Sequence, residues 1–249
     1  SSTMGMIIPP SIPMVLYAVT AQESVGRLFL GGVFPGIIVG LLQLCITIWI
    51  SNKNSYPRED GSLSIKTILT MTAKNSYILF MPFFVVGSVI LGVATATESA
   101  ALGVFYALII GVFLIKSLQL KRIYKALKSS VLTSAKIMII IAFSKIFIWV
   151  LAYERIPDQL SESVSALGLS STSMLLLFVI IILISGTFID VSPAILLFTP
   201  VFLPSIVEMG ISPILFGVIL VIGLAVGACT PPVGNCLNVC AIITGLSIG

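Results

Sequence analysis

The sequence contains no histidine and very few charged residues. Its 249 residues include 13 Lys and Arg and 9 Asp and Glu, so charged residues make up 9% of the chain. A soluble domain usually carries about 25% charged residues, whereas apolar residues here reach 58%. The composition therefore excludes an ordinary soluble domain and indicates a polytopic membrane protein, with the lipid bilayer as its surroundings.

These absences also exclude several function classes. An intramembrane protease would need a second deep Asp, a Ser with His, or a His-rich metal site. The four cysteines (45, 229, 236 and 240) lie in apolar stretches without His or carboxylate neighbours, as expected of small buried hydrophobes. Ten of the 13 basic residues fall in two segments, 51–76 and 116–136, rather than on one face. We therefore expect no enzyme and no nucleic-acid partner.

Two short segments far apart in the chain share one pattern. They read Gly5-Met6-Ile7-Ile8-Pro9-Pro10 and Gly227-Ala228-Cys229-Thr230-Pro231-Pro232, and they precede Ser24-Val25-Gly26 and Ser247-Ile248-Gly249. Pro-Pro removes two backbone donors and ends a helix. Such a repeated break within apolar sequence is typical of a secondary transporter made of two related halves, although a packing kink at each break is the alternative.

The apolar stretches divide the chain into four parts. Residues 1–50 hold a half-helix (7–21) and a full span (28–50), and residues 51–76 hold a cytoplasmic loop and an amphipathic helix (64–76) at the membrane surface. Residues 77–152 hold three spans (77–93, 98–115 and 137–152), the second starting at Thr97 as N-cap. Residues 174–249 hold a hairpin (174–206) and a broken helix (213–244), predicted to form the transport core.

Lys and Arg counts predict the orientation of these segments. Residues 51–76 contain four basic residues and residues 116–136 contain six, whereas 153–173 contain one and 207–213 none. We read the first two as cytoplasmic loops and the last two as external ones. The chain then leaves the first break heading outward and the second heading inward, so the two repeats are antiparallel across the membrane.

Asp190 is the only charged residue between positions 163 and 207, and it lies in the middle of the apolar stretch 174–206. A carboxylate at the bilayer centre costs at least about 2.5–3.5 kcal/mol, so it must face protein, an ion or water. We expect a re-entrant helix–turn–helix hairpin with Asp190 at its tip. The alternative is one span over 174–192 with Asp190 at an interface.

Both breaks offer oxygen ligands and helix ends. Around the second break lie the Thr230 hydroxyl, the freed carbonyls of 227–230, Gly234 and Asn235, which suit a hard monovalent cation such as Na⁺. The half-helix N-termini that follow, at Asn235 and at Ser11, favour a carboxylate. Predicted substrate-binding residues are Asp190, Ser185, Ser192, Ser11 and Asn235.

Two further charges lie within apolar segments. Lys145 is about seven residues from either end of its span, so snorkelling or a contact with a partner subunit is a better interpretation than a substrate role. Glu98 lies at a helix start beside Thr95 and Thr97, where structural and functional roles remain equally open.

Three motifs resemble the large membrane subunit of tripartite ATP-independent periplasmic (TRAP) transporters. They are Ile8-Pro9-Pro10-Ser11-Ile12-Pro13, Ala94-Thr95-Ala96-Thr97-Glu98-Ser99-Ala100-Ala101 and Thr230-Pro231-Pro232-Val233-Gly234. Their order and spacing cover nearly the whole chain. Where the family usually has Thr-Pro-Thr-Glu-Ala, this chain has Thr95-Ala96-Thr97-Glu98-Ser99. We expect the chain to be the later part of a larger polypeptide, with the family's first hairpin upstream.

The resemblance implies Na⁺-driven uptake of an organic acid, such as sialic acid or a C4-dicarboxylate, across the bacterial inner membrane. A periplasmic binding protein would deliver the substrate, a small membrane subunit would form a static scaffold, and the large subunit would move its core as an elevator. The implied Na⁺ ligands are Gly186, Gly227, Thr230 and Val233, with Thr187 beside them, and Ser2, Gly5 and Ile8 in a mirror site. Asp190 would line the substrate cavity and hold a cation, or a hydroxyl or amide of the substrate.

The sequence therefore predicts an all-α polytopic membrane protein, namely an inverted-repeat, elevator-type transporter with a re-entrant hairpin and broken helices. A Na⁺/dicarboxylate elevator symporter that needs no binding protein is the nearest alternative. A channel is a further one, and it would show no counterflow of labelled substrate.

Overall fold

The computed structural model describes residues 2–54, 64–116, 118–159, 162, 168 and 170–245, which form helices and connections with no strand among them. The second Ser-Ile-Gly motif and most of the predicted 51–63 loop lie outside these residues. The helices are α1 (Ser2–Ile7), α2 (Ile12–Ala21), α3 (Val25–Lys53), α4 (Ile65–Lys74), α5 (Ser76–Ile90), α6 (Ala96–Ile109) with a π-helical end η1 (Ile110–Leu114), α7 (Leu120–Tyr153), α9 (Ser171–Gly186), α10 (Val191–Glu208), α11 (Pro213–Gly227) and α12 (Asn235–Thr244).

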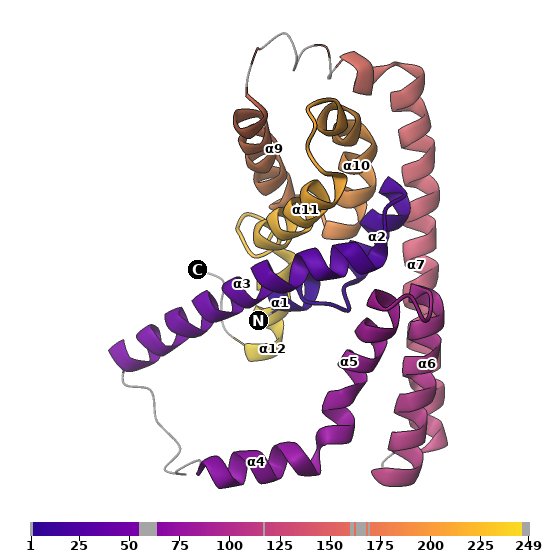
Figure 1. Cartoon of the computed structure of the whole chain (residues 1–249), viewed down its shortest axis with the longest axis vertical. Helices are drawn as coiled ribbons and strands as arrows, with labels where there is room; N and C mark the ends of the chain where they lie inside the picture. Colours follow the sequence, from indigo (N-terminus) through magenta and orange to yellow (C-terminus); the bar gives the residue numbers. More distant parts are fainter. Residues whose placement is uncertain are drawn as a thin grey trace.

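The described helices are long and apolar enough for several membrane crossings. Five helical segments meet the length and composition of a span, or six if α4 and α5, which meet at a bend of 64°, count as one. The predicted all-α polytopic membrane protein is therefore confirmed. Figure 1 shows the chain rising through α2 after the first break and descending through α12 after the second.

The start of α6 differs from the expectation. The N-cap is Thr95 and not Thr97: the Thr95 hydroxyl accepts from the Glu98 backbone N–H at 3.3 Å, and the Glu98 carboxylate accepts from the Thr95 N–H at 2.8 Å. This reciprocal pair is a capping box, which satisfies two donors that the first turn would otherwise leave unpaired. Glu98 therefore has a structural role in this helix.

The predicted loop over 116–136 is mostly helix. The long α7 runs without interruption from Leu120 to Tyr153, so five of the six basic residues of that segment lie on its first half. At about 1.5 Å per residue the helix is roughly 50 Å long, which exceeds the roughly 30 Å hydrocarbon core of a bilayer. Its basic end therefore projects beyond the hydrocarbon region.

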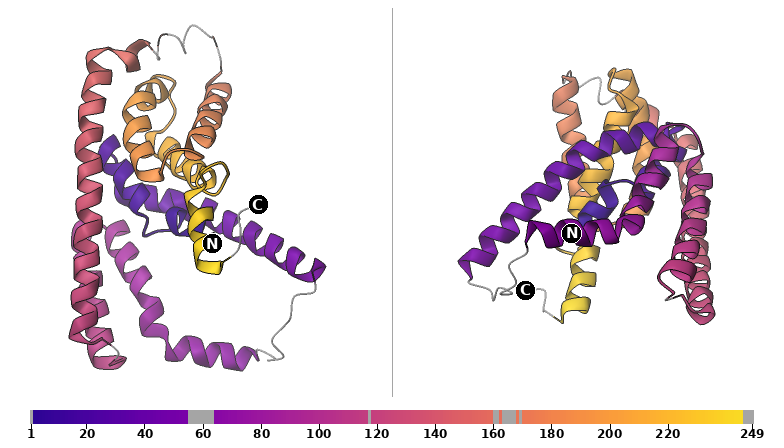
Figure 2. Two further views of the ribbon diagram at one scale, coloured as in Figure 1. Left: turned by 180° about the vertical axis from the view of Figure 1, so that it is seen from behind. Right: turned by 60° about the horizontal axis from the view of Figure 1, so that its bottom comes forward.

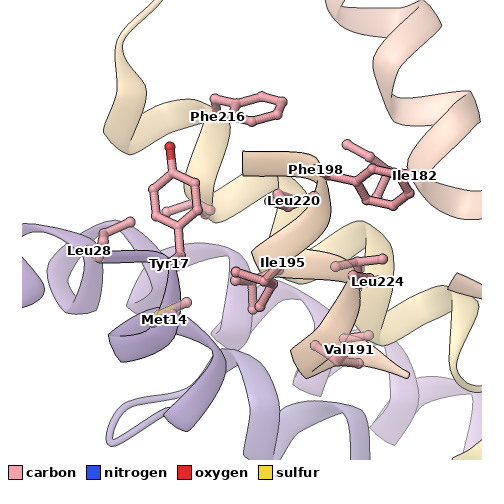
Figure 3. Packing of buried hydrophobic residues seen from close by; sticks show 14 of the residues in the cluster. Met14, Tyr17, Leu28, Ile182, Val191, Ile195, Phe198, Phe216, Leu220 and Leu224 are labelled. Carbon is pink, nitrogen blue, oxygen red and sulfur yellow. The ribbon is translucent and has the colours of Figure 1, made fainter. Parts of the chain in front are cut away.

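The hydrophobic core lies where α2, α10 and α11 meet, with α9 and the start of α3 beside them. Figure 3 shows Tyr17, Ile195 and Phe216 converging between these helices. The Tyr17 hydroxyl donates to the Pro213 carbonyl at 2.6 Å, which gives this buried polar atom a partner. The core thus joins α2 to the α9–α10 hairpin and to α11.

The helices α4, α5 and α6 lie below this core in the view of Figure 1, and Figure 2 shows the same arrangement from two other sides. The α5–α6 pair is joined by Ser88 and Ser99 at 2.7 Å and by the Tyr106 hydroxyl, which donates to the Tyr77 carbonyl at 2.6 Å. The long α7 runs up one side of the molecule and contacts α10.

One limb of the hairpin contains two prolines. Pro200 and Pro204 lie inside α10, so the carbonyls of Leu196 and Pro200 lack their usual helical donors. The buried Thr199 and Ser205 hydroxyls on the same helix have no hydrogen-bond partner among the described residues. Packing against α2, α7 and α11 therefore holds α10 in place.

Candidate functional site

The tip of the α9–α10 hairpin forms a short turn over residues 187–190. The Ser185 carbonyl accepts from the Phe188 and Ile189 N–H groups at 3.0 and 2.9 Å, and the Thr187 hydroxyl donates to the Ile184 carbonyl at 2.7 Å. These bonds close the C-terminal end of α9. No hydrogen bond to the Gly186 carbonyl is found among the described residues, so its oxygen remains available as a ligand.

The second break begins where α11 ends at Gly227. The Thr230 N–H donates to the Gly227 carbonyl at 2.8 Å, and the Thr230 hydroxyl donates to the Val226 carbonyl at 3.0 Å. The peptide bond between Pro231 and Pro232 is cis, and Gly234 has a φ of 47° before α12 starts at Asn235. The predicted unwound segment is thus the connection 228–234.

The hairpin tip and the second break touch through two glycines. A Cβ atom on Gly227 would lie 2.7 Å from the Gly186 backbone and 3.0 Å from the Leu183 carbonyl oxygen. Any larger residue at position 227 would therefore push the two helix ends apart. This close approach places the C-terminal ends of α9 and α11, which carry partial negative charge, side by side.

Two polar contacts connect the same elements. The Val233 N–H donates to the Thr187 carbonyl at 3.3 Å, and the Asn235 side-chain amide donates to the Asp190 carboxylate at 3.4 Å. Asp190 is exposed, occupies the N-cap position of α10, and makes no capping bond with its side chain. The Asp190 carboxylate therefore does not cap α10, and it lies beside the N-terminus of α12.

Most of the predicted second-repeat residues therefore come together. The structure pairs Gly186 with Gly227, Thr187 with Val233, and Asp190 with Asn235. Ser185 and Ser192 flank the turn and are half-buried. Among the described residues no group of three or more His, Cys, Asp or Glu side chains could hold a metal ion. Carbonyl and hydroxyl oxygens are the ligands on offer here, and these suit an alkali cation.

At the first break, Ser11 forms hydrogen bonds within its own segment. Ser11 is buried, and its hydroxyl donates to the Met6 carbonyl at 2.5 Å and accepts from the Met14 N–H at 3.3 Å. These bonds cap α2 and join it to α1, so a substrate role for Ser11 stays a prediction.

The three predicted mirror-site residues lie along α1 and the turn after it. Ser2 starts α1, Gly5 is exposed within it, and the N–H of half-buried Ile8 donates to the Met4 carbonyl at 2.8 Å. The helix α1 that carries Ser2 and Gly5 packs against α11, which ends at the second break. Their part in a cation site remains a prediction.

Three residues that were not predicted as site residues link α1, α3 and the second break. The Gln43 amide of α3 donates to the buried Thr3 hydroxyl at 3.0 Å, and that hydroxyl lies 3.9 Å from the Cys229 sulfur. Thr3 belongs to α1 and Cys229 to the second break, so α1 lies beside the second break. Of the three, only Gln43 could have been noticed in the sequence as a residue that needs a polar partner, because it is the only amide in the apolar run 28–50.

Comparisons with known proteins identify related sequences over the whole chain. Residues 1–249 match the family described as "Tripartite ATP-independent periplasmic transporter, DctM component". The chain is 35% identical over 249 residues to the C4-dicarboxylate TRAP transporter large permease protein DctM of Pseudomonas aeruginosa, covering 100% of the chain and 58% of the relative. It is 34% identical over 248 residues to the isethionate TRAP transporter permease protein DctMQ of Oleidesulfovibrio alaskensis, covering 100% of the chain and 39% of the relative.

A third relative is the sialic acid TRAP transporter large permease protein SiaM of Vibrio cholerae, which is 31% identical over 243 residues, or 96% of the chain and 56% of the relative. The chain therefore spans about half the length of the curated relatives it matches. All three are named as permease proteins and none as an enzyme, in agreement with the prediction from the missing histidine.

Proposed function

Because this chain belongs to the DctM family of tripartite ATP-independent periplasmic transporters, we propose that it is part of a permease that takes up a small organic acid. The family and the apolar helices make it a multi-pass protein of the bacterial inner membrane. The observation that carries the proposal is the contact between the hairpin tip and the second break, where Gly186 meets Gly227 and Asn235 meets Asp190. Unwound helices of this kind are where secondary transporters bind their cargo.

We propose Na⁺ as the co-transported ion. Two helix C-termini converge at Gly186 and Gly227, and the Gly186 carbonyl and the Thr230 hydroxyl lie at that junction. The partial negative charge of helix ends and the neutral oxygens suit a monovalent cation without a full counter-charge. Thr187 and Val233 complete the proposed site, and Ser2, Gly5 and Ile8 contribute to a second one.

The proposed substrate is a carboxylate compound. The N-termini of α10 and α12 lie at the hairpin tip and the second break, and each carries the partial positive charge that attracts an anion. C4-dicarboxylates and sialic acid, named for two relatives, are the candidates. Asp190 would then hold a cation or a hydroxyl or amide of the substrate, because two carboxylates repel each other.

The wider assembly follows from the family. We propose that a periplasmic binding protein delivers the substrate and that a small membrane subunit accompanies this chain. The hairpin and the broken helix would move together as the transport core, because the core packing joins α2, α9, α10 and α11.

Uptake by the complete permease in proteoliposomes tests the proposal. Labelled succinate and sialic acid are offered outside, with and without an inward Na⁺ gradient and with and without the purified binding protein. Uptake of one acid that needs both the gradient and the binding protein is the expected result. Uptake that is independent of Na⁺ would contradict the coupling, and equal uptake without the binding protein would favour a simple symporter.

A further inference from the structure

The apolar half of α7 is largely uncovered. No described residue of this helix is buried, and large apolar side chains along it are exposed, among them Met138, Ile146 and Trp149. The helix leans on α10 along one side (Figure 1). Its other side presents an apolar surface with one positive charge, Lys145.

The depth of Lys145 follows from its neighbours. A crevice between α7 and α10 is lined by Phe143, Ser144 and Phe147 on one side and by Ile189, Pro193 and Leu197 on the other. This stretch of α7 is therefore level with the hairpin tip. Along the helix, Lys145 lies about 12 Å from Ile137 and about 10 Å from Ala152, the ends of the apolar stretch, at about 1.5 Å per residue.

The direction of Lys145 follows from helix geometry. Successive residues are about 100° apart around the axis, so Lys145 lies about 160° from Phe147 and about 100° from Ser144, which both face the hairpin. Its side chain is exposed. Lys145 therefore points away from the hairpin, toward the surroundings of the protein.

We propose that Lys145 forms an ion pair with an aspartate or glutamate on a transmembrane helix of a second membrane protein that packs on this face of α7. An ionised side chain at that depth is expensive in hydrocarbon and is usually paired. A carboxylate on an apolar helix would complement both the charge and the exposed apolar surface. This inference rests on the proposed function, which includes a small membrane subunit.

A second copy of this chain does not fit as the partner. Among the described residues, Asp190 already accepts a hydrogen bond from Asn235. The other described carboxylates lie at helix ends or in connections, at positions 23, 98, 154, 158, 162 and 208. Of these, Glu98 lies within an apolar segment, and its carboxylate already accepts hydrogen bonds from the Thr95 N–H and hydroxyl.

Co-purification tests the ion pair without any transport measurement. The complete permease is co-expressed with the small membrane subunit of its own transport system, and the subunit retained on the tagged permease is quantified. Lys145→Met should lower the retained subunit at least tenfold, because the partner carboxylate is left unpaired, and Lys145→Arg should retain it. Lys136→Met is the matched control, since this exposed lysine on the same helix lies outside the apolar stretch.

Charge exchange then identifies the partner residue. In the Lys145→Glu permease, each intramembrane Asp or Glu of the small subunit is replaced by Lys, and one exchange should restore retention. Normal retention by the Lys145→Met and Lys145→Glu permeases would overturn the inference and indicate a lysine that reaches lipid phosphates. Failure of the wild-type pair to co-purify would overturn it as well. Since retention needs no substrate, these results are separate from those of the uptake assay.

Discussion

Asp190 is the residue on which the transport hypothesis depends most directly. Its carboxylate is exposed at the hairpin tip, does not cap α10, and accepts one hydrogen bond of 3.4 Å from Asn235. Since neither the helix nor the core requires its charge, replacing it with an amide should change chemistry more than stability.

We expect Asp190→Asn to reduce initial uptake at least about tenfold, equivalent to about 1.4 kcal/mol, because the change removes the charge and keeps the shape. Thermal unfolding of the same preparation should be unchanged. Asp158→Asn, at an exposed position after α7, is the control. A parallel fall in uptake and melting temperature would assign Asp190 a structural role.

Thr230 tests the proposed cation site at the same scale. Its hydroxyl donates to the Val226 carbonyl and leaves its oxygen lone pairs available. We expect Thr230→Val to raise the Na⁺ concentration for half-maximal uptake by about tenfold, the cost of one weak ligand at about 1.4 kcal/mol. Thr244→Val is matched, because that hydroxyl makes the same kind of bond to the Cys240 carbonyl on α12. An unchanged Na⁺ dependence would remove Thr230 from the site.

At the scale of elements, the contact between α9 and α11 sets the geometry of the site. Gly227→Ala would place a methyl group 2.7 Å from the Gly186 backbone, so we expect a loss of about 1–3 kcal/mol of stability from overpacking. Gly5→Ala is the control, since a Cβ there meets no atom within 4 Å. Thermal unfolding in detergent measures both. Equal melting temperatures for the two variants would show that the helices can separate at no cost.

The α6 capping box is a second feature of this scale. Thr95→Ala should lower the melting temperature by about 2–4 °C, the shift expected for the loss of one cap in a protein of this size. Thr97→Ala, at an exposed position two residues later, should leave it unchanged. A lower melting temperature for Thr97→Ala than for Thr95→Ala would instead identify Thr97 as the N-cap.

The sequence predicted the helices and the breaks between them better than it predicted the residues at which the helices begin. Pro-Pro pairs and the lone Asp190 marked the breaks, because few physical arrangements tolerate them in a membrane. The spacing Thr95-x-x-Glu98 could have identified the cap of α6, but Thr97 competed as an equally good residue. The first half of α7 was taken for a loop because of its charge, although Lys, Arg, Leu and Ala are strong helix formers.

At the scale of the whole molecule, the N-terminal helices α1 and α3 meet the second break through a short series of polar contacts. Gln43, Thr3 and Cys229 lie on three separate elements, and 226 positions separate Thr3 from Cys229. No pattern in one sequence indicates such a contact. The pairs Gly186–Gly227 and Asp190–Asn235 were likewise predicted only as members of one site, without their partners.

The Thr3 link should matter for the stability of the whole. Thr3→Val keeps the shape but removes the acceptor of the half-buried Gln43 amide, and leaving such a donor unpaired costs about 1–3 kcal/mol. We expect a lower melting temperature than for Thr47→Val, whose exposed hydroxyl bonds its own helix at the Gln43 carbonyl. Thr3→Ser should restore the wild-type value. An unchanged melting temperature for Thr3→Val would show that the link is dispensable.

The prolines of α10 give the hairpin limbs unequal stiffness. The 16-residue α9 has no proline to interrupt its backbone hydrogen bonds. In α10, Pro200 and Pro204 each remove one backbone N–H donor and so one helical hydrogen bond. The backbone of α10, the limb that carries Asp190 at its start, is therefore the easier of the two to bend. The compliant limb presents the carboxylate, and the stiff limb keeps Gly186 against Gly227.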